Sequence, residues 1–378
     1  MTSGYLARVR KLRPHPSRML VVAMLLAGGG IAFVATTAGV DAVVDRFGGF
    51  RPEWFLLALA MQVVAFAGYA LAYRRIVSMN GGPRLEPSLV IRLVATGFGG
   101  SAPGGGFAID YRALRTLGDP RSAAIQVLGL GALEYAVIAP AACLASAAML
   151  LVGTDVHPVI LWPWILAVPA GFAFVTWTAA PGRQDRIVGG KHGKGWRMLA
   201  DVLAGVDLLR QMAVRPLRFS PAYLGVAVYW AGEIISLWAA IESVGATLAA
   251  GPLIVGLATG YAMTRRSMPF GGAGATEVLL TFALSWAGLG LATAAAAMIT
   301  YRFCSFVLPM LPGLWAHGEV IHLIEPDLAM EASRGFDPDT SSEQATQRWL
   351  RAAPGSGSAS SMTNTDQEKS RAPMPPPV

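Results

Sequence analysis

The sequence is poor in charged residues. Only 14% of its 378 residues are Asp, Glu, Lys or Arg, whereas a soluble globular chain averages about 25%. Hydrophobic residues make up 54% of the chain, and the mean hydropathy is +0.49. This composition excludes an ordinary soluble protein and predicts an all-α polytopic membrane protein.

Cysteine and histidine are also scarce. The two cysteines, Cys143 and Cys304, lie in apolar segments, so the sequence implies no disulfide framework. The five histidines are scattered without ligand spacing, and we expect no metal site. The sequence also lacks a recognisable nucleophile–base pair and a nucleotide-binding loop. We therefore expect neither an enzyme nor a bound cofactor.

One stretch, Thr264–Gly288, interrupts apolar sequence with two arginines, a Pro-Phe-Gly-Gly-Ala-Gly break and a glutamate. The apolar runs before the arginines, 252–263, and after the glutamate, 278–288, each correspond to roughly 18 Å of helix, which is too short for a hydrocarbon core of about 30 Å. Two half-length helices that meet at a glycine break predict a re-entrant hairpin, buried in protein or lining a wet cavity. The alternative is a pair of ordinary short helices that both cross the membrane.

The segment 89–118 repeats this arrangement and predicts a first hairpin. The correspondences are Ala95–Phe98 with Ala258–Tyr261, Pro103–Gly106 with Pro269–Gly274, and, allowing an offset of one residue, Asp110 with Glu277. The chain therefore contains an internal repeat.

Six longer apolar runs predict spanning helices, at residues 19–40, 54–73, 123–151, 160–180, 221–244 and 292–315. The basic segment 1–18 places the N-terminus in the cytoplasm, and residues 41–53 form an outer loop. The net charge of +7 follows the same positive-inside pattern, so we expect no nucleic-acid partner. Alternation then gives an inverted-topology repeat with about six spanning helices and two re-entrant helical hairpins. Secondary transporters with this arrangement bind their substrates near the midplane.

The expected organisation has three parts. Residues 1–18 form a basic cytoplasmic N-terminus, and residues 19–320 form the transmembrane domain, with repeat halves at about 19–152 and 159–316. Residues 321–378 are polar and rich in Ser, Thr, Gly and Pro, which predicts a largely disordered cytoplasmic tail. A short surface helix is expected at 319–331.

Eight ionisable residues fall at predicted membrane depth: Arg92, Arg265, Arg266, Arg302, Asp110, Glu134, Glu233 and Glu277. A central charge costs about 2.5–3.5 kcal/mol even on the lenient insertion scale, so each is a candidate functional residue. Three structural alternatives stay open. Glu134, Glu233 and Arg302 could form ion pairs between helices. Asp110 and Glu277 could be helix-start carboxylates, and the arginine pair could lie in a solvated loop.

The functional interpretation is an anion site at the two breaks. A half-helix that follows glycines offers unpaired N–H groups and a partial positive charge to a closely approaching ligand. Arginine adds a fork of donors that suits phosphate. The candidate substrate-binding residues are Gly104, Gly105, Gly106, Gly271, Gly272, Gly274 and the eight ionisable residues. The predicted ligand is a phosphate-bearing lipid headgroup.

At these residues the chain resembles a known family. The pattern Pro269-x-Gly-Gly-x-Gly-x-x-Glu277, followed by Gly288 and Tyr301-Arg302, is similar to the flippase-like family typified by the transmembrane region of lysylphosphatidylglycerol synthases. The resemblance covers roughly residues 20–320. It implies an integral protein of the bacterial inner membrane that moves a lipid or lipid-linked substrate between leaflets. The basic N-terminal segment and the alternation of spans place both termini in the cytoplasm. Ala108-Ile109-Asp110 departs from the pattern, which more often has a Gly-Glu pair there.

The resemblance does not extend to synthase activity, because the polar tail is too short and too polar for a transferase domain. Three functions stay open: a translocase for a membrane lipid, a secondary transporter of a small anion or solute, and a non-transporting membrane scaffold. A lateral opening to lipid beside the arginines would favour the translocase. Coupling to a proton carried by Glu233 or Glu277 also stays open.

Overall fold

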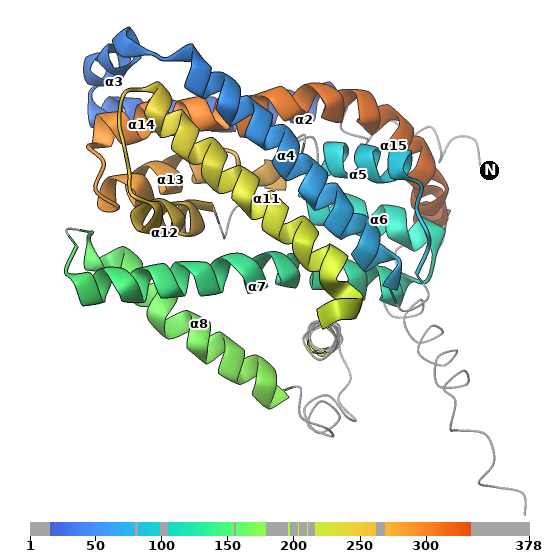
Figure 1. Ribbon diagram of the computed structural model, residues 1–378. Coiled ribbons are helices and arrows are strands. Elements are labelled where there is room, and N and C mark those ends of the chain that lie inside the picture. Colours follow the sequence, from blue (N-terminus) through green and yellow to red (C-terminus); the bar gives the residue numbers. More distant parts are fainter. Residues whose placement is uncertain are drawn as a thin grey trace, which may run out of the picture. The chain divides into compact units, whose positions relative to one another are not determined.

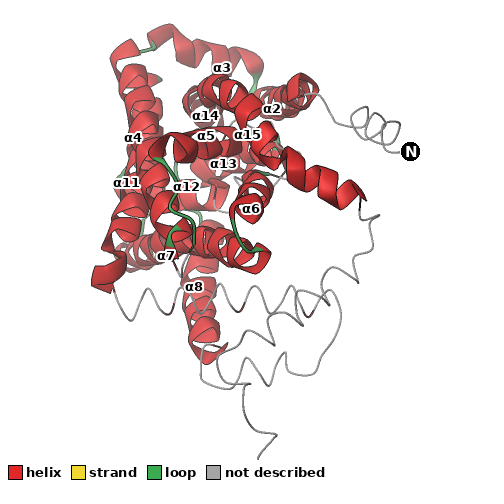
Figure 2. Ribbon diagram, turned by 90° about the vertical axis from the view of Figure 1, so that its right-hand side faces the viewer, coloured by secondary structure: helices red, strands yellow, loops and turns green. Residues whose placement is uncertain are grey.

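The computed structural model describes residues 16–79, 82–98, 105–154, 156–178, 216–261 and 269–333, together with the single residues 196, 203 and 210. Residues up to Asp327 form one compact unit, and the second unit, Leu328–Val378, contributes only the end of the last helix to the described residues. The described segments are helices joined by short turns, without a strand among them (Figure 2). The prediction of an all-α polytopic membrane protein is confirmed.

Six helical segments among the described residues are long and apolar enough to cross a membrane. They are α2 (Pro16–Ala38), α4 (Pro52–Val77), α7 (Pro120–Val152), α8 (Pro158–Thr178), α11 (Pro216–Ser243) and the continuous run of α14 (Leu291–Arg302), the π-helical turn η4 (Phe303–Val307) and α15 (Leu308–Ser333). Large apolar side chains such as Leu25, Leu144 and Leu151 are exposed on these helices. Such a surface is suited to lipid contact.

Four short helices form two pairs at the predicted hairpins. α5 (Pro87–Phe98) precedes α6 (Gly106–Leu117), and α12 (Ala250–Tyr261) precedes α13 (Ala275–Trp286), each with 12 residues. α12 and α13 pack side by side (Figure 1). The order of two long helices, two short helices and one long helix thus occurs twice along the chain. The short helices have the predicted lengths, while their re-entrance and the inverted repeat stay predictions.

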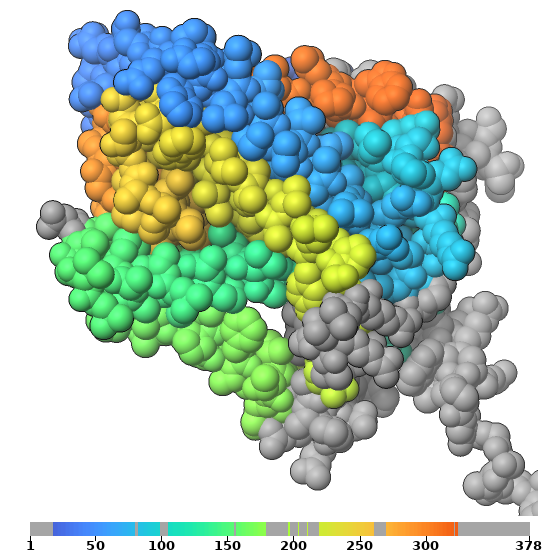
Figure 3. All heavy atoms as spheres, in the orientation of Figure 1, coloured from blue at the N-terminus to red at the C-terminus, as the bar shows by residue number. Residues whose placement is uncertain are grey.

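α4 and α11 form the most extensive helix contact and lie side by side across the face shown in Figure 3. The approach depends on glycine, because a Cβ on Gly68 would lie 2.6 Å from the amide nitrogen of Tyr229 and 2.7 Å from the carbonyl oxygen of Gly225. Small residues at such crossings allow the backbones of membrane helices to pack closely. Tyr69 and Tyr229 meet edge to face beside this contact, with ring centroids 5.3 Å apart.

The structure differs from the sequence prediction in two connecting segments. Residues 41–53 are not a simple loop, because α3 (Val40–Arg46) and the 3-10 turn η1 (Phe47–Gly49) occupy them. Gly39, with φ of 88°, ends α2, and Val43 is buried in the main core, so hydrophobic contact supports the extra helix. A helix does occupy residues 319–331, but it is the end of α15, which runs continuously from Leu308 to Ser333 and is not a short helix of its own.

Candidate functional site

The break before α13 is a left-handed turn. Phe270, Gly271, Gly272 and Gly274 have φ values of 55°, 65°, 73° and 87°. Phe270 is the one residue other than glycine with positive φ among the described residues. A non-glycine residue in this region is strained, and such strain persists only where the surroundings impose it. The turn ends at Gly274, directly before the first residue of α13, and so sets the position at which α13 begins.

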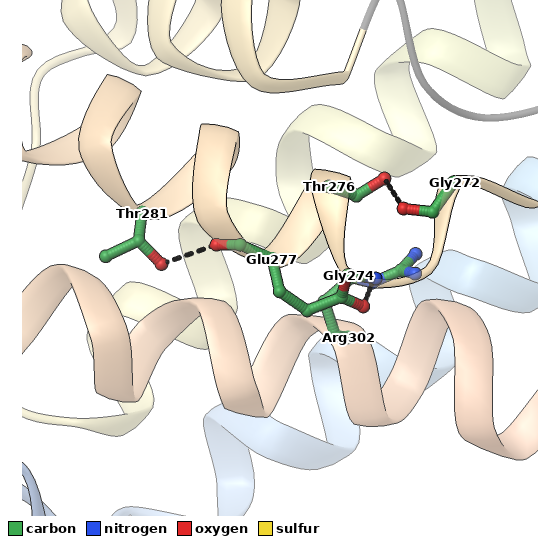
Figure 4. A network of polar contacts seen from close by, with 6 residues as sticks. All are labelled: Gly272, Gly274, Thr276, Glu277, Thr281 and Arg302. Atoms are coloured by element: carbon green, nitrogen blue, oxygen red, sulfur yellow. Dashed lines mark hydrogen bonds and ion pairs between the residues drawn. The ribbon is translucent and has the colours of Figure 1, made fainter. Parts of the chain in front are cut away.

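The carboxylate of Glu277 joins the start of α13 to α14. Glu277 is the third residue of α13, and its Oε2 accepts a hydrogen bond of 2.7 Å from the backbone N–H of Gly274. Its Oε1 accepts a second bond of 2.7 Å from Nε of Arg302 (Figure 4). Both side chains are buried, with 0% and 3% exposure. The helix-start alternative therefore applies to Glu277, and the ion-pair alternative applies to Arg302, whose partner is Glu277.

Arg302 has further contacts and one unused donor. Its guanidinium lies over the ring of Phe306, 4.3 Å from the centroid. Nη2 has no hydrogen-bond partner among the described residues, and neither does the buried hydroxyl of Ser305. The π-helical turn η4 starts directly after Arg302. Single π-helical turns within α-helices often mark functional sites, because they change the direction of the neighbouring side chains.

α2 passes directly over the break. A Cβ on Gly30 would lie 2.7 Å from the carbonyl oxygen and 2.9 Å from the Cα of Gly274, and 3.2 Å from the Cβ of Glu277. Only glycine allows this approach. Gly30 was missed as a candidate residue from the sequence. The run of three glycines at 28–30 in the first apolar segment was the available signal.

A second buried carboxylate, that of Glu233 on α11, is bound by Tyr301, the residue of α14 that precedes Arg302. The hydroxyl of Tyr301 donates a hydrogen bond to Oε2 of Glu233, and Gln62 Nε2 on α4 donates to the same oxygen at 3.1 Å. Gln62 also donates to Ser236 at 3.0 Å. Tyr301 and Arg302 are consecutive, so the end of α14 holds a carboxylate from α11 and another from α13. Gln62 could not be identified from the sequence, and Tyr301 was singled out there only as part of the family pattern.

The first hairpin is built differently. Gly105, with φ of 78°, precedes α6, and Gly106 is its buried first residue. Asp110 is fully buried but is the fifth residue of α6, whereas Glu277 is the third of α13. The prediction that the two carboxylates occupy equivalent positions is therefore wrong. Asp110 lies in the second turn of its helix, too far from the helix start to act as a cap.

Arg92 lies apart from the Glu277–Arg302 pair. It forms an ion pair with Glu319 on α15, and about a third of its side chain is exposed. Roughly 25 Å of helix separate Glu319 from Arg302 at 1.5 Å per residue. The structure therefore groups Gly271, Gly272, Gly274, Glu277 and Arg302, with Glu233 adjacent through Tyr301, and excludes Arg92 from this group.

The remaining candidates have other positions. Glu134 is buried on α7, and its carbonyl oxygen accepts a hydrogen bond of 2.9 Å from the indole N–H of Trp230 on α11. Arg265, Arg266 and Gly104 lie outside the described residues. The solvated-loop alternative for the arginine pair therefore stays open.

Two comparisons with known proteins bear on this arrangement. The family model described as the lysylphosphatidylglycerol synthase TM region matches residues 20–313. A search of curated proteins finds no match. The family match spans the long helices from α2 to α14 and both pairs of short helices, and it confirms the resemblance that the residues of the second break indicated.

Proposed function

Because the chain belongs to the family of the lysylphosphatidylglycerol synthase transmembrane region, we propose that it is a flippase-like translocase. Its substrate would be an anionic lipid or a lipid-linked molecule that it moves between the leaflets of the bacterial inner membrane. The observation that carries the proposal is the buried Glu277–Arg302 pair at the glycine break before α13. The family match supports a lipid-related membrane protein, and the pair supports a headgroup site.

Charged side chains at membrane depth are expensive and are found where they pair or face a polar path. Irregular backbone is tolerated there only if protein or a wet cavity surrounds it. The break before α13 combines both features with helix-start N–H groups and a guanidinium, which are the donors that bind phosphate. A headgroup could bind them while its acyl chains stay in lipid.

The proposal includes an orientation. We place both termini in the cytoplasm, since basic residues are concentrated in the segment 1–18 and in the segment 181–218. We propose no enzymatic step and no cofactor. The translocase would act by exposing the headgroup site to one leaflet and then to the other, as transporters with broken helices do.

The test is leaflet exchange of fluorescent phosphatidylglycerol in proteoliposomes. The double variant Glu277→Gln/Arg302→Gln removes the charges together, so no uncompensated buried charge is left. We expect exchange by the wild type and a loss of about 10- to 100-fold in the variant, the equivalent of one or two charge-assisted hydrogen bonds.

The matched control is Arg51→Gln/Glu242→Gln. This pair has an N–O distance of 3.9 Å, and half of the Arg51 side chain is exposed. We expect the control to keep wild-type exchange. Equal exchange by all three proteins would retain the translocase but reject the site. Absence of exchange by folded wild-type protein, with phosphatidylglycerol and with other anionic lipids, would contradict the proposed function and favour a small-solute transporter or a scaffold.

A further inference from the structure

The two oxygens of Glu277 are held by donors that commonly bind phosphate. Oε2 accepts from a backbone N–H at the start of α13, and Oε1 accepts from a guanidinium, each at 2.7 Å. Proteins hold phosphate oxygens with the same two kinds of donor. The carboxylate therefore occupies a position in which an anionic ligand would be bound.

Arg302 could bind more than it does. Its side chain is 3% exposed, and Nη2 has no acceptor among the described residues. In Figure 4 the guanidinium lies under the Gly272–Gly274 turn, and its terminal nitrogens extend beyond the Glu277 carboxylate. A buried N–H without an acceptor costs free energy that a ligand oxygen would recover. The fork of arginine favours a ligand that engages two of its nitrogens.

We propose that Glu277 is an internal substitute for the ligand: a phosphate-bearing headgroup binds Arg302 by displacing the Glu277 carboxylate, and Glu277 then takes up a proton. This inference rests on the proposed function and names the exchange that occurs at its site. One phosphate oxygen binds Nη2, and a second replaces Oε1 at Nε. Glu277 keeps the Gly274 N–H through Oε2, and the proton, taken from solution, binds Oε1.

Charge balance requires the proton. Glu277 and Arg302 together are neutral, so a bound phosphate adds a negative charge to a buried place. A buried carboxylate that has lost its cation is neutralised by protonation, because desolvation of an unpaired charge is too costly. One proton is therefore bound for each phosphate, and phosphate affinity increases as the pH is lowered.

Among the described residues, Arg302 is the charged side chain in contact with Glu277. From α2, the backbone of Leu26 and Gly30 faces the break, and the one charged residue of this helix, Arg18, lies near its N-terminus. The described side chains of α12 carry no charge. On α14, Tyr301 donates its hydroxyl to Glu233, which is the neighbouring buried carboxylate.

The first measurement uses the wild type alone. Dihexanoyl phosphatidylglycerol is titrated calorimetrically into the full-length protein in nanodiscs of zwitterionic lipid, in two buffers with different enthalpies of ionisation. We expect uptake of close to one proton per bound lipid and a decrease in affinity of up to about tenfold per unit increase in pH. Inorganic phosphate is titrated in parallel. Binding of the lipid alone assigns the site to a headgroup, and equal binding of both assigns it to phosphate from either source.

The second measurement uses Glu277→Gln, which removes the internal competitor. We expect roughly tenfold tighter lipid binding, the equivalent of one charge-assisted hydrogen bond, and no proton uptake. Glu242→Gln, at another arginine-paired and mostly buried glutamate, is expected to match the wild type. Lipid binding without proton uptake in the wild type, or weaker binding by Glu277→Gln, would overturn the inference and leave the translocase intact. A wild type that neither binds nor exchanges lipid would instead refute the proposed function.

Discussion

At the scale of single residues, the site depends on Tyr301 and Arg302, which are consecutive in sequence and bind different carboxylates. Tyr301 donates to Glu233, and Arg302 donates to Glu277. Replacing Tyr301 with Phe removes one donor from a fully buried carboxylate and keeps the ring. We expect a loss of about 1–3 kcal/mol in the free energy of unfolding. The measurement is the unfolding midpoint of the purified protein in detergent.

Tyr135→Phe is the control for this loss. Tyr135 lies on α7 and its side chain is 40% exposed, so removal of its hydroxyl should leave the midpoint nearly unchanged. Equal midpoints for the two variants would mean that the Tyr301–Glu233 bond contributes nothing to stability. A loss restricted to Tyr301→Phe would show that the stability of α14 depends on a carboxylate from α11.

The residues that carry charge in this region could be identified from the sequence, but their pairing could not. Charged residues are rare within apolar segments, because burial of any charge is costly. Their presence there identifies Glu233, Glu277 and Arg302 as candidates. The choice of partner depends on how helices far apart in sequence meet. Gln62 shows the limit: a neutral side chain in an apolar run gives no signal until α4 and α11 pack together.

At the scale of helices, the close approach of α2 to the break predicts different effects of alanine at two neighbouring glycines, Gly30 and Gly29. Gly30→Ala places a Cβ 2.7 Å from the carbonyl oxygen of Gly274, so α2 or the break has to move. We expect a destabilisation of about 1–3 kcal/mol, as in overpacked cores, and slower lipid exchange. The measurements are the unfolding midpoint and exchange in proteoliposomes.

Gly29→Ala is a matched control on the same helix. A Cβ at Gly29 meets nothing within 4 Å, and alanine is a better helix former than glycine by about 1 kcal/mol. This variant should be as stable as the wild type or more stable. If the two variants behave alike, the contact between α2 and the break has no energetic importance.

The elements themselves could largely be predicted, for a physical reason. A segment of about twenty apolar residues forms a helix in a membrane, because only a helix satisfies its backbone hydrogen bonds within the segment. Glycine and proline mark the ends of the short helices. α3 was missed because it depends on contacts: Val43 packs into a core formed by distant helices. The helix expected at 319–331 is present, but as the end of α15, and its continuity with the last spanning helix was not predicted.

At the scale of the whole molecule, the proposed inverted repeat predicts which side of the membrane each hairpin is reached from. From the proposed cytoplasmic N-terminus, α2 would cross outward and α4 inward, so the first hairpin would begin inside. With residues 179–215 kept in the cytoplasm, α7, α8 and α11 then give three crossings, and the second hairpin begins outside. Ser88 and Thr247, both exposed, lie at these two starts. A cysteine at Thr247 should react with a membrane-impermeant maleimide in intact cells, whereas one at Ser88 should react only after permeabilisation.

The labelling background needs Cys143 and Cys304 replaced by alanine, since both are free thiols. Each variant is its own control, because permeabilised cells show whether the position reacts at all. Labelling of both positions from the same side would contradict an inverted arrangement. Opposite labelling would mean that the two glycine breaks are reached from opposite leaflets. A lipid headgroup that changes leaflet needs this geometry, because its binding site has to become accessible first from one side and then from the other.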